Sequence, residues 1–445
     1  MEKINRQCAG IDVGSAKVFM SPDGKEVISY ETFTTDFREL VKRLKSLGIT
    51  SVAMEATGVY WVILYEMIQA AGIEVYLIDA RQTKQVPGRK TDVKDAQWIQ
   101  QLHSYGLLNR CHVTVGQIQT LKVYQRMRED HIGRAATHVN HMQKALTQMN
   151  IRLSEVLSQV HGKSGLSIIR AILAGERDKQ KLLDLCATSI KKRKSDEVLK
   201  ALEGFYNEEQ LFALQQSYDG YEFYQKQIEQ CDQKLDEILT EISANKDDVD
   251  VAKKRKAIRH HKPKVKELAK MLVKISQGKD PTILPGITDY THLRLLGELG
   301  MDLSIWPSEK KFTSWLGLAP GQNNSGKKNR NKSKAGKFRA GQIFRQSARS
   351  IIQSKTIALG AFGRRIKARK GPGIAVKATA RKLAEMYWRV MVKGSDYVEK
   401  GIEQYQEQYM YQRMKYVHKL AKQLNMSVSH DGYPGNDTSM TNSNL

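Results

Sequence analysis

Residues 88–102 read GRKTDVKDAQWIQQL, a pattern typical of the start of an α-helix. Thr91 is of a residue type that caps helices, and the apolar residues after it recur at helical spacing. Asp92 and Asp95 are three residues apart, so a helix places both carboxylates on one face of its first turn. The simplest explanation is that acids near a helix N-terminus are stabilised by the macrodipole. Under that explanation, the two aspartates need no acidic partners elsewhere in the chain. Acids upstream in strand-like surroundings would instead indicate that the pair belongs to a functional site.

Two upstream acids lie in stretches that predict β-strands. Residues 6–34 indicate three strands joined by tight turns, with Asp12 in the first strand. The segment SVAMEA, residues 51–56, predicts a short buried strand with Glu55 near its end. Strand hairpins followed by alternating strands and helices predict a mixed α/β domain around a central sheet. The other expected elements are helices over about 37–47 and 58–72 and a strand over 74–80.

These four acids are expected to converge at the carboxyl edge of the sheet. Taken singly, Asp12 fits a turn residue at a strand end, and Glu55 fits a helix-capping or solvated acid. An acid after Gly10 and Ile11 in an otherwise apolar strand is nevertheless costly without a role. Four neighbouring carboxylates repel unless cations neutralise them, and Mg²⁺ is bound by a few carboxylates plus substrate phosphates. The pattern therefore predicts a site for two Mg²⁺ ions that act on a phosphodiester.

Composition indicates a soluble chain with a polyanionic partner. The 445 residues are 40% hydrophobic, carry a net charge of +25 and have a pI near 9.7, so a nucleic acid is the natural partner. The four cysteines contain no C-x-x-C pair, which argues against a structural zinc site or a disulfide framework. Apolar stretches are too short to span a bilayer. We expect a cytoplasmic, nucleoid-associated protein.

Three segments carry a resemblance to a known family: GIDVGSAK (10–17), VAMEATGVYW (52–61) and KTDVKDA (90–96). In this order they resemble the N-terminal domain of IS110/IS1111 family transposases, whose fold is similar to the Holliday-junction resolvase RuvC within the RNase H-like group. The resemblance implies a four-acid metal site. Its residues would be Asp12, Glu55, Asp92 and Asp95.

The middle of the chain predicts long helices. Residues 117–150 predict one helix with basic faces; its histidines lack the further ligands that a zinc site needs. Residues 211–242 follow a heptad pattern and predict a coiled-coil arm that pairs with another helix or another protomer. A long amphipathic helix packed within its own domain fits about equally well. The basic run 253–266 fits a linker or a nucleic-acid contact.

The following segment predicts nucleic-acid binding. Leu284-Pro285-Gly286-Ile287 resembles the turn of a helix-hairpin-helix. No acidic residue occurs between Glu309 and Glu385, whereas Lys and Arg occur throughout. A solvated face normally mixes both signs, so this stretch indicates a polyanion. The expected contact residues are Lys327, Lys328, Arg330, Lys332, Lys334, Lys337, Arg339 and Arg345.

Ser325 lies in this basic region, within GQNNSGKKNRNK. Asn-Asn-Ser-Gly is common turn chemistry, and no spacing identifies a base for its hydroxyl. The passages LPGI, FTSWLGLAP, QNNSGKK and KAGKFR are similar to the C-terminal domain of the same transposase family, which implies that Ser325 is the nucleophile. It would form a covalent phosphoserine intermediate with DNA. The resemblance further implies a guide RNA encoded by the element. The heptad pattern predicts a homo-oligomer, a dimer or tetramer built through the helical arm.

The expected domains follow from these segments. They are a RuvC-like DEDD domain over 1–150, a helical coiled-coil spacer over 151–279, a mainly α-helical transposase domain over 280–400, and a C-terminal helix with a disordered tail over 401–445. Two alternatives to a transposase stay open. One is a junction-resolving nuclease that uses water as its nucleophile, and the other is a non-catalytic architectural nucleic-acid binder.

Overall fold

The protein is described by a computed structural model that covers residues 2–80, 82–83, 92–251, 256–258, 260–320, 338–394, 396–424 and 426, and the backbone of 324–325 and 328–329. The chain divides into two compact units, Met1–Val113 and Thr114–Leu445. Thr91, the expected helix cap, lies outside the described residues.

The first unit is built on a five-stranded mixed sheet with the order β3-β2-β1-β4-β5. The strands are β1 (Cys8–Val13), β2 (Lys17–Ser21), β3 (Ile28–Glu31), β4 (Ser51–Glu55) and β5 (Glu74–Ile78). The first three strands pair antiparallel, whereas β1, β4 and β5 run parallel, so their carboxyl ends meet at one edge. The sheet is compatible with the expected RNase H-like domain.

Helices cover both faces of this sheet. Alternate residues of β1 face opposite sides, as strand geometry requires. Ala9, Ile11 and Val13 pack with α1 (Thr34–Ser46) and α2 (Trp61–Ala70). On the other face, α3 (Asp92–Ser104) packs against β1 and β4. The strands and helices predicted for this region are therefore confirmed.

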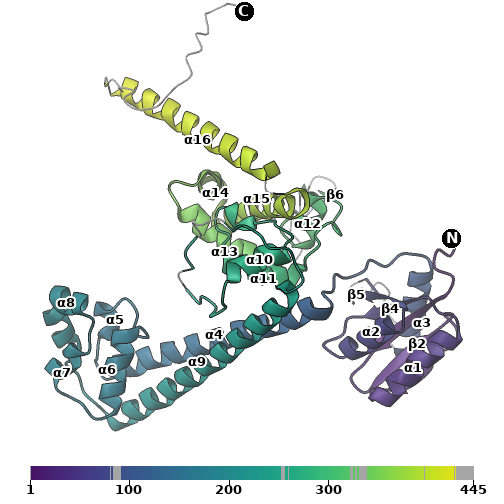
Figure 1. Cartoon of the computed structure of the whole chain (residues 1–445), viewed down its shortest axis with the longest axis horizontal. Helices are drawn as coiled ribbons and strands as arrows, with labels where there is room; N and C mark the ends of the chain where they lie inside the picture. The colour runs from purple at the N-terminus through teal and green to yellow at the C-terminus, as the bar shows by residue number, and fades with distance from the viewer. Residues whose placement is uncertain are drawn as a thin grey trace, which may run out of the picture. The chain divides into compact units, whose positions relative to one another are not determined.

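Two long helices dominate the first part of the second unit. These are α4 (Gly116–Gln148) and α9 (Glu208–Ser243), which lie side by side (Figure 1). The end of α4 packs with the start of α9, and the start of α4 with the end of α9, so the pair is antiparallel. Four shorter helices pack around the end of α4 and the start of α9. They are α5 (Leu153–Val156), α6 (Lys163–Leu173), α7 (Lys179–Asp184) and α8 (Thr188–Ala201).

The heptad residues of α9 face α4 of the same chain. Leu235, Ile238 and Ile242 are buried in a cluster that includes Leu121 of α4. The pattern therefore identified the buried face of the helix, and the described partner is intramolecular. Coiled-coil geometry itself stays a prediction.

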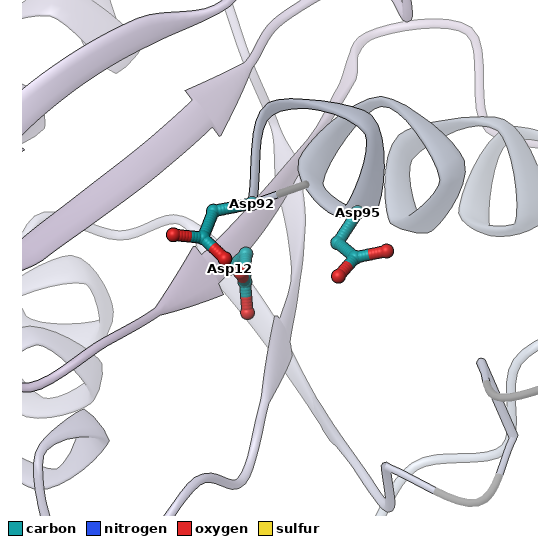
Figure 2. Close-up of side chains that lie close together, drawn as sticks. All are labelled: Asp12, Asp92 and Asp95. Carbon is teal, nitrogen blue, oxygen red and sulfur yellow. The ribbon is translucent and has the colours of Figure 1, made fainter. Parts of the chain in front are cut away.

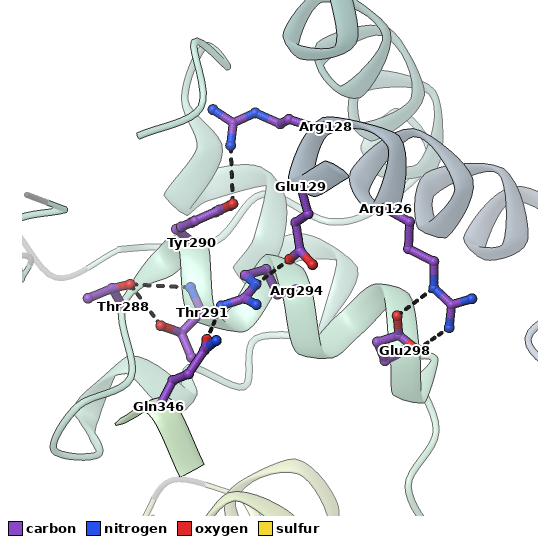
Figure 3. Close-up of polar contacts among 9 residues, drawn as sticks. All are labelled: Arg126, Arg128, Glu129, Thr288, Tyr290, Thr291, Arg294, Glu298 and Gln346. Carbon is purple, nitrogen blue, oxygen red and sulfur yellow. Dashed lines mark hydrogen bonds and ion pairs between the residues drawn. The ribbon is translucent and has the colours of Figure 1, made fainter. Parts of the chain in front are cut away.

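Charged side chains join α4 to α9 and to α11 (Asp289–Leu299), and Figure 3 shows the contacts between α4 and α11. Arg128 and Asp232 form an ion pair at 2.6 Å with both side chains 2% exposed, and Arg128 also donates to the Tyr290 hydroxyl at 3.1 Å. Arg126 donates twice to Glu298, at 2.8 and 2.7 Å. These contacts link α4 to both neighbouring helices, and the Arg128–Asp232 pair is the buried one.

The rest of the second unit is mainly helical. Its elements are α10 (Leu268–Ile275), η1 (Pro281–Ile283), α12 (Glu309–Trp315), β6 (Asn324–Ser325), β7 (Lys328–Asn329), α13 (Arg339–Gln353), α14 (Ala358–Lys370), α15 (Pro372–Lys393) and α16 (Asp396–Gln423). Helices α11 to α15 share one apolar core, which includes Phe312, Phe344 and Tyr387. Helix α16 lies where a C-terminal helix was expected, and residues 427–445 lie outside the described part.

The predicted helix-hairpin-helix is not formed as expected. Its first helix is only the three-residue 3-10 turn η1. Pro285 lacks an amide hydrogen and disfavours helical backbone in the residue before it, so Leu284 is extended. Gly286 then takes a φ of +73°, and α11 starts three residues later.

The first compact unit ends at Val113, whereas the expected domain ran to residue 150. The difference arises because α4 packs on α9 and α11 and so belongs to the second unit. None of the helices in the described ranges is both long and apolar enough to cross a membrane.

Candidate active site

Gly10 determines how closely α3 approaches the sheet. A Cβ at this position would lie 2.3 Å from the Gln100 backbone nitrogen and 2.5 Å from the Ala96 carbonyl oxygen. A glycine inside a strand often marks such a close approach. Asp12 is two residues further along β1, on the same face as Gly10, so the start of α3 lies next to its carboxylate.

Three carboxylates meet at this point (Figure 2). Asp12 projects from the end of β1, and Asp92 and Asp95 project from the first turn of α3. Ligand oxygens of the three lie within 4.8 Å of one another. Burial, followed by the charges of Glu55, Asp95 and Asp92, raises the pKa of Asp12 to about 7. The cluster therefore holds a proton, or another cation, near neutral pH.

Glu55 lies beside this cluster. β1 and β4 pair in parallel with Ile11 opposite Met54, so Asp12 and Glu55 follow at neighbouring strand positions. The Glu55 carboxylate accepts hydrogen bonds from the Thr83 hydroxyl at 3.0 Å and the Thr57 hydroxyl at 3.3 Å. Its negative charge helps to raise the pKa of Asp12. Its oxygens, however, do not belong to the three-residue cluster whose ligand oxygens lie within 4.8 Å of one another.

The donor set fits a hard divalent cation. Carboxylate oxygens are the ligands that Mg²⁺ and Ca²⁺ prefer, and Mg²⁺ commonly takes one or two protein carboxylates plus phosphate oxygens. Asp12, Asp92 and Asp95 would hold the ion, which would also relieve the repulsion that raises the pKa of Asp12. The acid cluster, meaning these three residues, thus indicates divalent-metal use.

The backbone around Ser325 forms a short hairpin. Strands β6 and β7 pair antiparallel, with Ser325 opposite Lys328. Side chains of this loop are outside the described part of the structure. So are the side chains of six of the expected nucleic-acid contacts, namely Lys327, Lys328, Arg330, Lys332, Lys334 and Lys337.

The other two expected contacts lie on α13. Arg339 is exposed at the first position of the helix, and Arg345 is half-buried. The Arg345 Nε atom is buried and has no hydrogen-bond partner among the described residues. Burial and the Arg345 charge lower the pKa of Lys377 on α15. Two neighbouring cations, one with an unused donor, form a suitable site for a phosphate.

Sequence models of two protein families match the chain. One, described as a transposase and representing a DEDD domain of the IS110 type, matches residues 9–151, which include all four acids. The other, described as transposase of the IS116/IS110/IS902 family, matches residues 282–362. The chain belongs to the IS110 family of transposases. No curated protein matches it.

As a transposase, the protein acts on DNA. The first match covers the sheet, α3 and the acid cluster. The second begins at η1 and includes the hairpin that carries Ser325. The two candidate catalytic elements therefore lie in the two matched regions of the transposase.

Sequence reasoning missed two positioning residues. Gly10 allows the close approach of α3, and its place inside an apolar strand was the available signal. Thr83 holds the Glu55 carboxylate from a segment 28 residues away. Nothing in the local sequence of Thr83 indicates this contact, because it depends on packing between two segments that are distant in the sequence.

Proposed function

We propose that the transposase breaks and rejoins DNA strands of an insertion sequence through a serine nucleophile and a metal-binding acidic site. The observation that carries this proposal is the convergence of Asp12, Asp92 and Asp95 within 4.8 Å in a chain of the IS110 family. Glu55 completes the four-acid set from the neighbouring strand.

The acids would hold two Mg²⁺ ions against the DNA backbone. When bound, such a pair stabilises the attacking and leaving oxygens of a phosphodiester displacement. The residues of this chain orient the site: Gly10 admits α3, and the hydrogen bonds from Thr57 and Thr83 fix the Glu55 carboxylate. Second-sphere contacts of this kind commonly orient metal ligands.

Ser325 would attack a DNA phosphorus atom. A bond forms between the serine oxygen and phosphorus, the bond to one deoxyribose oxygen breaks, and that oxygen leaves as a hydroxyl with a proton. Attack by the hydroxyl of another strand end reverses the step and releases Ser325. One ester replaces another, so no nucleotide hydrolysis is needed, and the sequence contains no G-x-x-x-x-G-K-[ST] loop.

The acid-free segment between Glu309 and Glu385 would bind the nucleic acids. Arg345 and Lys377 support this, because their neighbouring charges suit a phosphate. We further propose an element-encoded guide RNA as a second polyanionic partner, which the net charge of +25 permits.

A dimer or tetramer would require a surface other than the heptad face of α9, since that face is packed on α4. Phe212 and Phe223 lie on the opposite, exposed face of α9, with exposed fractions of 67% and 54%. Exposed aromatic residues of this kind are typical of protein interfaces. We propose this face as the contact between protomers.

Strand transfer by matched variants tests the proposed function. The reaction contains the element's DNA ends, its non-coding RNA and Mg²⁺, and denaturing gels report cleavage, joining and protein bound covalently to DNA. Asp92→Asn should abolish all three, while Asp36→Asn, which also changes an acid in a first helical turn, should be active. Ser325→Ala should lose cleavage, the covalent adduct and joining, because the attack by Ser325 is the cleaving step, whereas Ser333→Ala in the same basic region should retain all three.

The alternatives predict different patterns. A nuclease that uses water would still cleave DNA after Ser325→Ala. If the protein were an architectural binder, neither the wild type nor any variant would cleave DNA, and Asp92→Asn would behave as the wild type does. Either pattern would refute the proposal.

A further inference from the structure

A cavity of about 930 Å³ lies within the second unit. Its walls come from α4, α9 and two connecting segments, around residues 159–161 and 260–264. Binding sites for small molecules commonly have volumes of 300–1,000 Å³. The cavity is therefore large enough for a ligand with a ring system and a charged group, and it involves neither the acid cluster nor Ser325.

One wall of the cavity is apolar. Ile132 and Val139 line it from α4, and Ile228 lines it from α9. Amide side chains are nearby, with Asn140 on α4 and Gln225 on α9 also lining the cavity. An apolar wall suits the face of a flat heterocycle, and amides suit the donors and acceptors on its edge.

Another part of the cavity lining consists of histidine side chains, whose ring N–H groups can donate hydrogen bonds. His161 comes from the segment before α6, and His260 and His261 come from the segment before α10. Burial, followed by the charges of Arg128, His260 and His161, lowers the pKa of His261, which places these groups close together. His261 also has a φ of +53°, a conformation that is uncommon outside glycine and often occurs at functional sites.

The acids that line the cavity do not neutralise all of its bases. Asp232 pairs with Arg128 at 2.6 Å, and Glu229 pairs with Lys264 at 2.7 Å. The remaining lysines are Lys226 and Lys262, neither of which forms an ion pair with any residue that the structure describes. Glu222 is the one other acid in the lining. Two lysines against one carboxylate favour an anion, and the three histidines add hydrogen-bond donors.

A metal ion fits this cavity poorly. Among the described residues, three metal-ligating groups come within 4.8 Å of one another at Asp12, Asp92 and Asp95 and at no other place. We infer that the cavity binds a nucleotide, with the heterocycle against the apolar wall of α4 and α9 and the phosphate between Lys226, Lys262 and the three histidines. The nucleotide is either a free mononucleotide or one residue of a nucleic-acid strand.

A displacement titration with the full chain tests this inference. The probe is fluorescent N-methylanthraniloyl-AMP, and the competitors are AMP, adenosine, inorganic phosphate and a single-stranded oligonucleotide. Lys226→Met/Lys262→Met removes two lining charges. Lys192→Met/Lys200→Met makes the same chemical change at exposed positions of α8 that do not line the cavity. Ala136→Phe narrows the cavity from an exposed α4 position and removes no charge.

We expect saturable probe binding, with AMP competing at least about tenfold better than adenosine, because charge-assisted hydrogen bonds supply much of the affinity. The lining double variant should bind the probe roughly tenfold or more weakly, Ala136→Phe should lose binding, and the α8 variant should bind as the wild type does. Displacement by the oligonucleotide identifies a strand as the ligand source, and displacement by AMP alone identifies a free nucleotide. Absence of saturable binding, equal competition by adenosine, or equal binding by all variants would overturn the inference. Thermal melting confirms that each variant is folded.

Discussion

The substitution Gly10→Ala should separate α3 from the sheet and disable the acid cluster. The new Cβ would lie 2.3 Å from the Gln100 nitrogen and 2.5 Å from the Ala96 oxygen, both of them backbone atoms. A change of side-chain rotamer cannot relieve such contacts, so α3 must shift by about 1 Å to restore ordinary van der Waals distances. Overpacking of this kind costs about 1–3 kcal/mol of unfolding free energy.

The same shift should weaken metal binding, because Asp92 and Asp95 move with α3 while Asp12 stays on β1. A misplacement of about 1 Å can cost roughly 100-fold in activity. The assay is calorimetric titration of wild type and Gly10→Ala with Mn²⁺, together with thermal denaturation. We expect the variant to bind Mn²⁺ at least about tenfold more weakly and to unfold at a lower temperature.

Gly133→Ala is the matched control, since a Cβ there has no atom within 4 Å. Gly133 lies in α4, where alanine favours the helix by about 0.5–1 kcal/mol. The control should bind Mn²⁺ normally and be at least as stable as the wild type. If Gly10→Ala matched the wild type in both Mn²⁺ affinity and melting temperature, the proposed role of the close approach would be refuted.

Three further predictions concern stability. In metal-free protein the pKa of Asp12 is raised from 3.8 to about 7, so the ionised form is disfavoured and stability falls as the pH rises between these values. Asp12→Asn should therefore raise the unfolding free energy at pH 8.5 by about 2 kcal/mol after allowance for solvent screening. At pH 4.5 the gain in unfolding free energy should be smaller. An equal gain at both pH values would contradict this prediction. Burial lowers the pKa of His103 to about 4 from 6.5, so stability should be lost as the pH falls through this interval, by about 3 kcal/mol. His103→Gln should flatten that part of the pH profile of urea unfolding, and an unchanged slope would argue against it. Arg128→Met leaves the buried Asp232 carboxylate without its partner and should cost about 3–5 kcal/mol, whereas Arg128→Met/Asp232→Leu should recover most of the loss. A loss below about 1 kcal/mol in urea unfolding, or no recovery in the double variant, would show that the pair contributes little.

The central sheet and the approach of its acids could be predicted because they follow from local rules. Apolar alternation identified the strands, and parallel strands place their carboxyl ends at one edge. Asp12 and Glu55 therefore had to be neighbours, and a helix start brought Asp92 and Asp95 to the same edge. The catalytic role of all four stays a proposal.

Features that depend on packing between distant segments could not be predicted. The heptad pattern of α9 identifies an apolar face but not the helix that covers it. The register of α4 and α9 depends on the buried Arg128–Asp232 pair, whose members are 104 residues apart. The sequence LPGI suggested a helical hairpin, but Pro285 limits the first helix to a single turn.

Diffraction from crystals soaked in Mn²⁺ tests the central claim most directly. Anomalous scattering locates Mn²⁺ without any assumption about the reaction. The account predicts a strong peak among the carboxylates of Asp12, Asp92 and Asp95, lost in Asp92→Asn and retained in Asp36→Asn. Strong Mn²⁺ peaks elsewhere with none among these three carboxylates would contradict it.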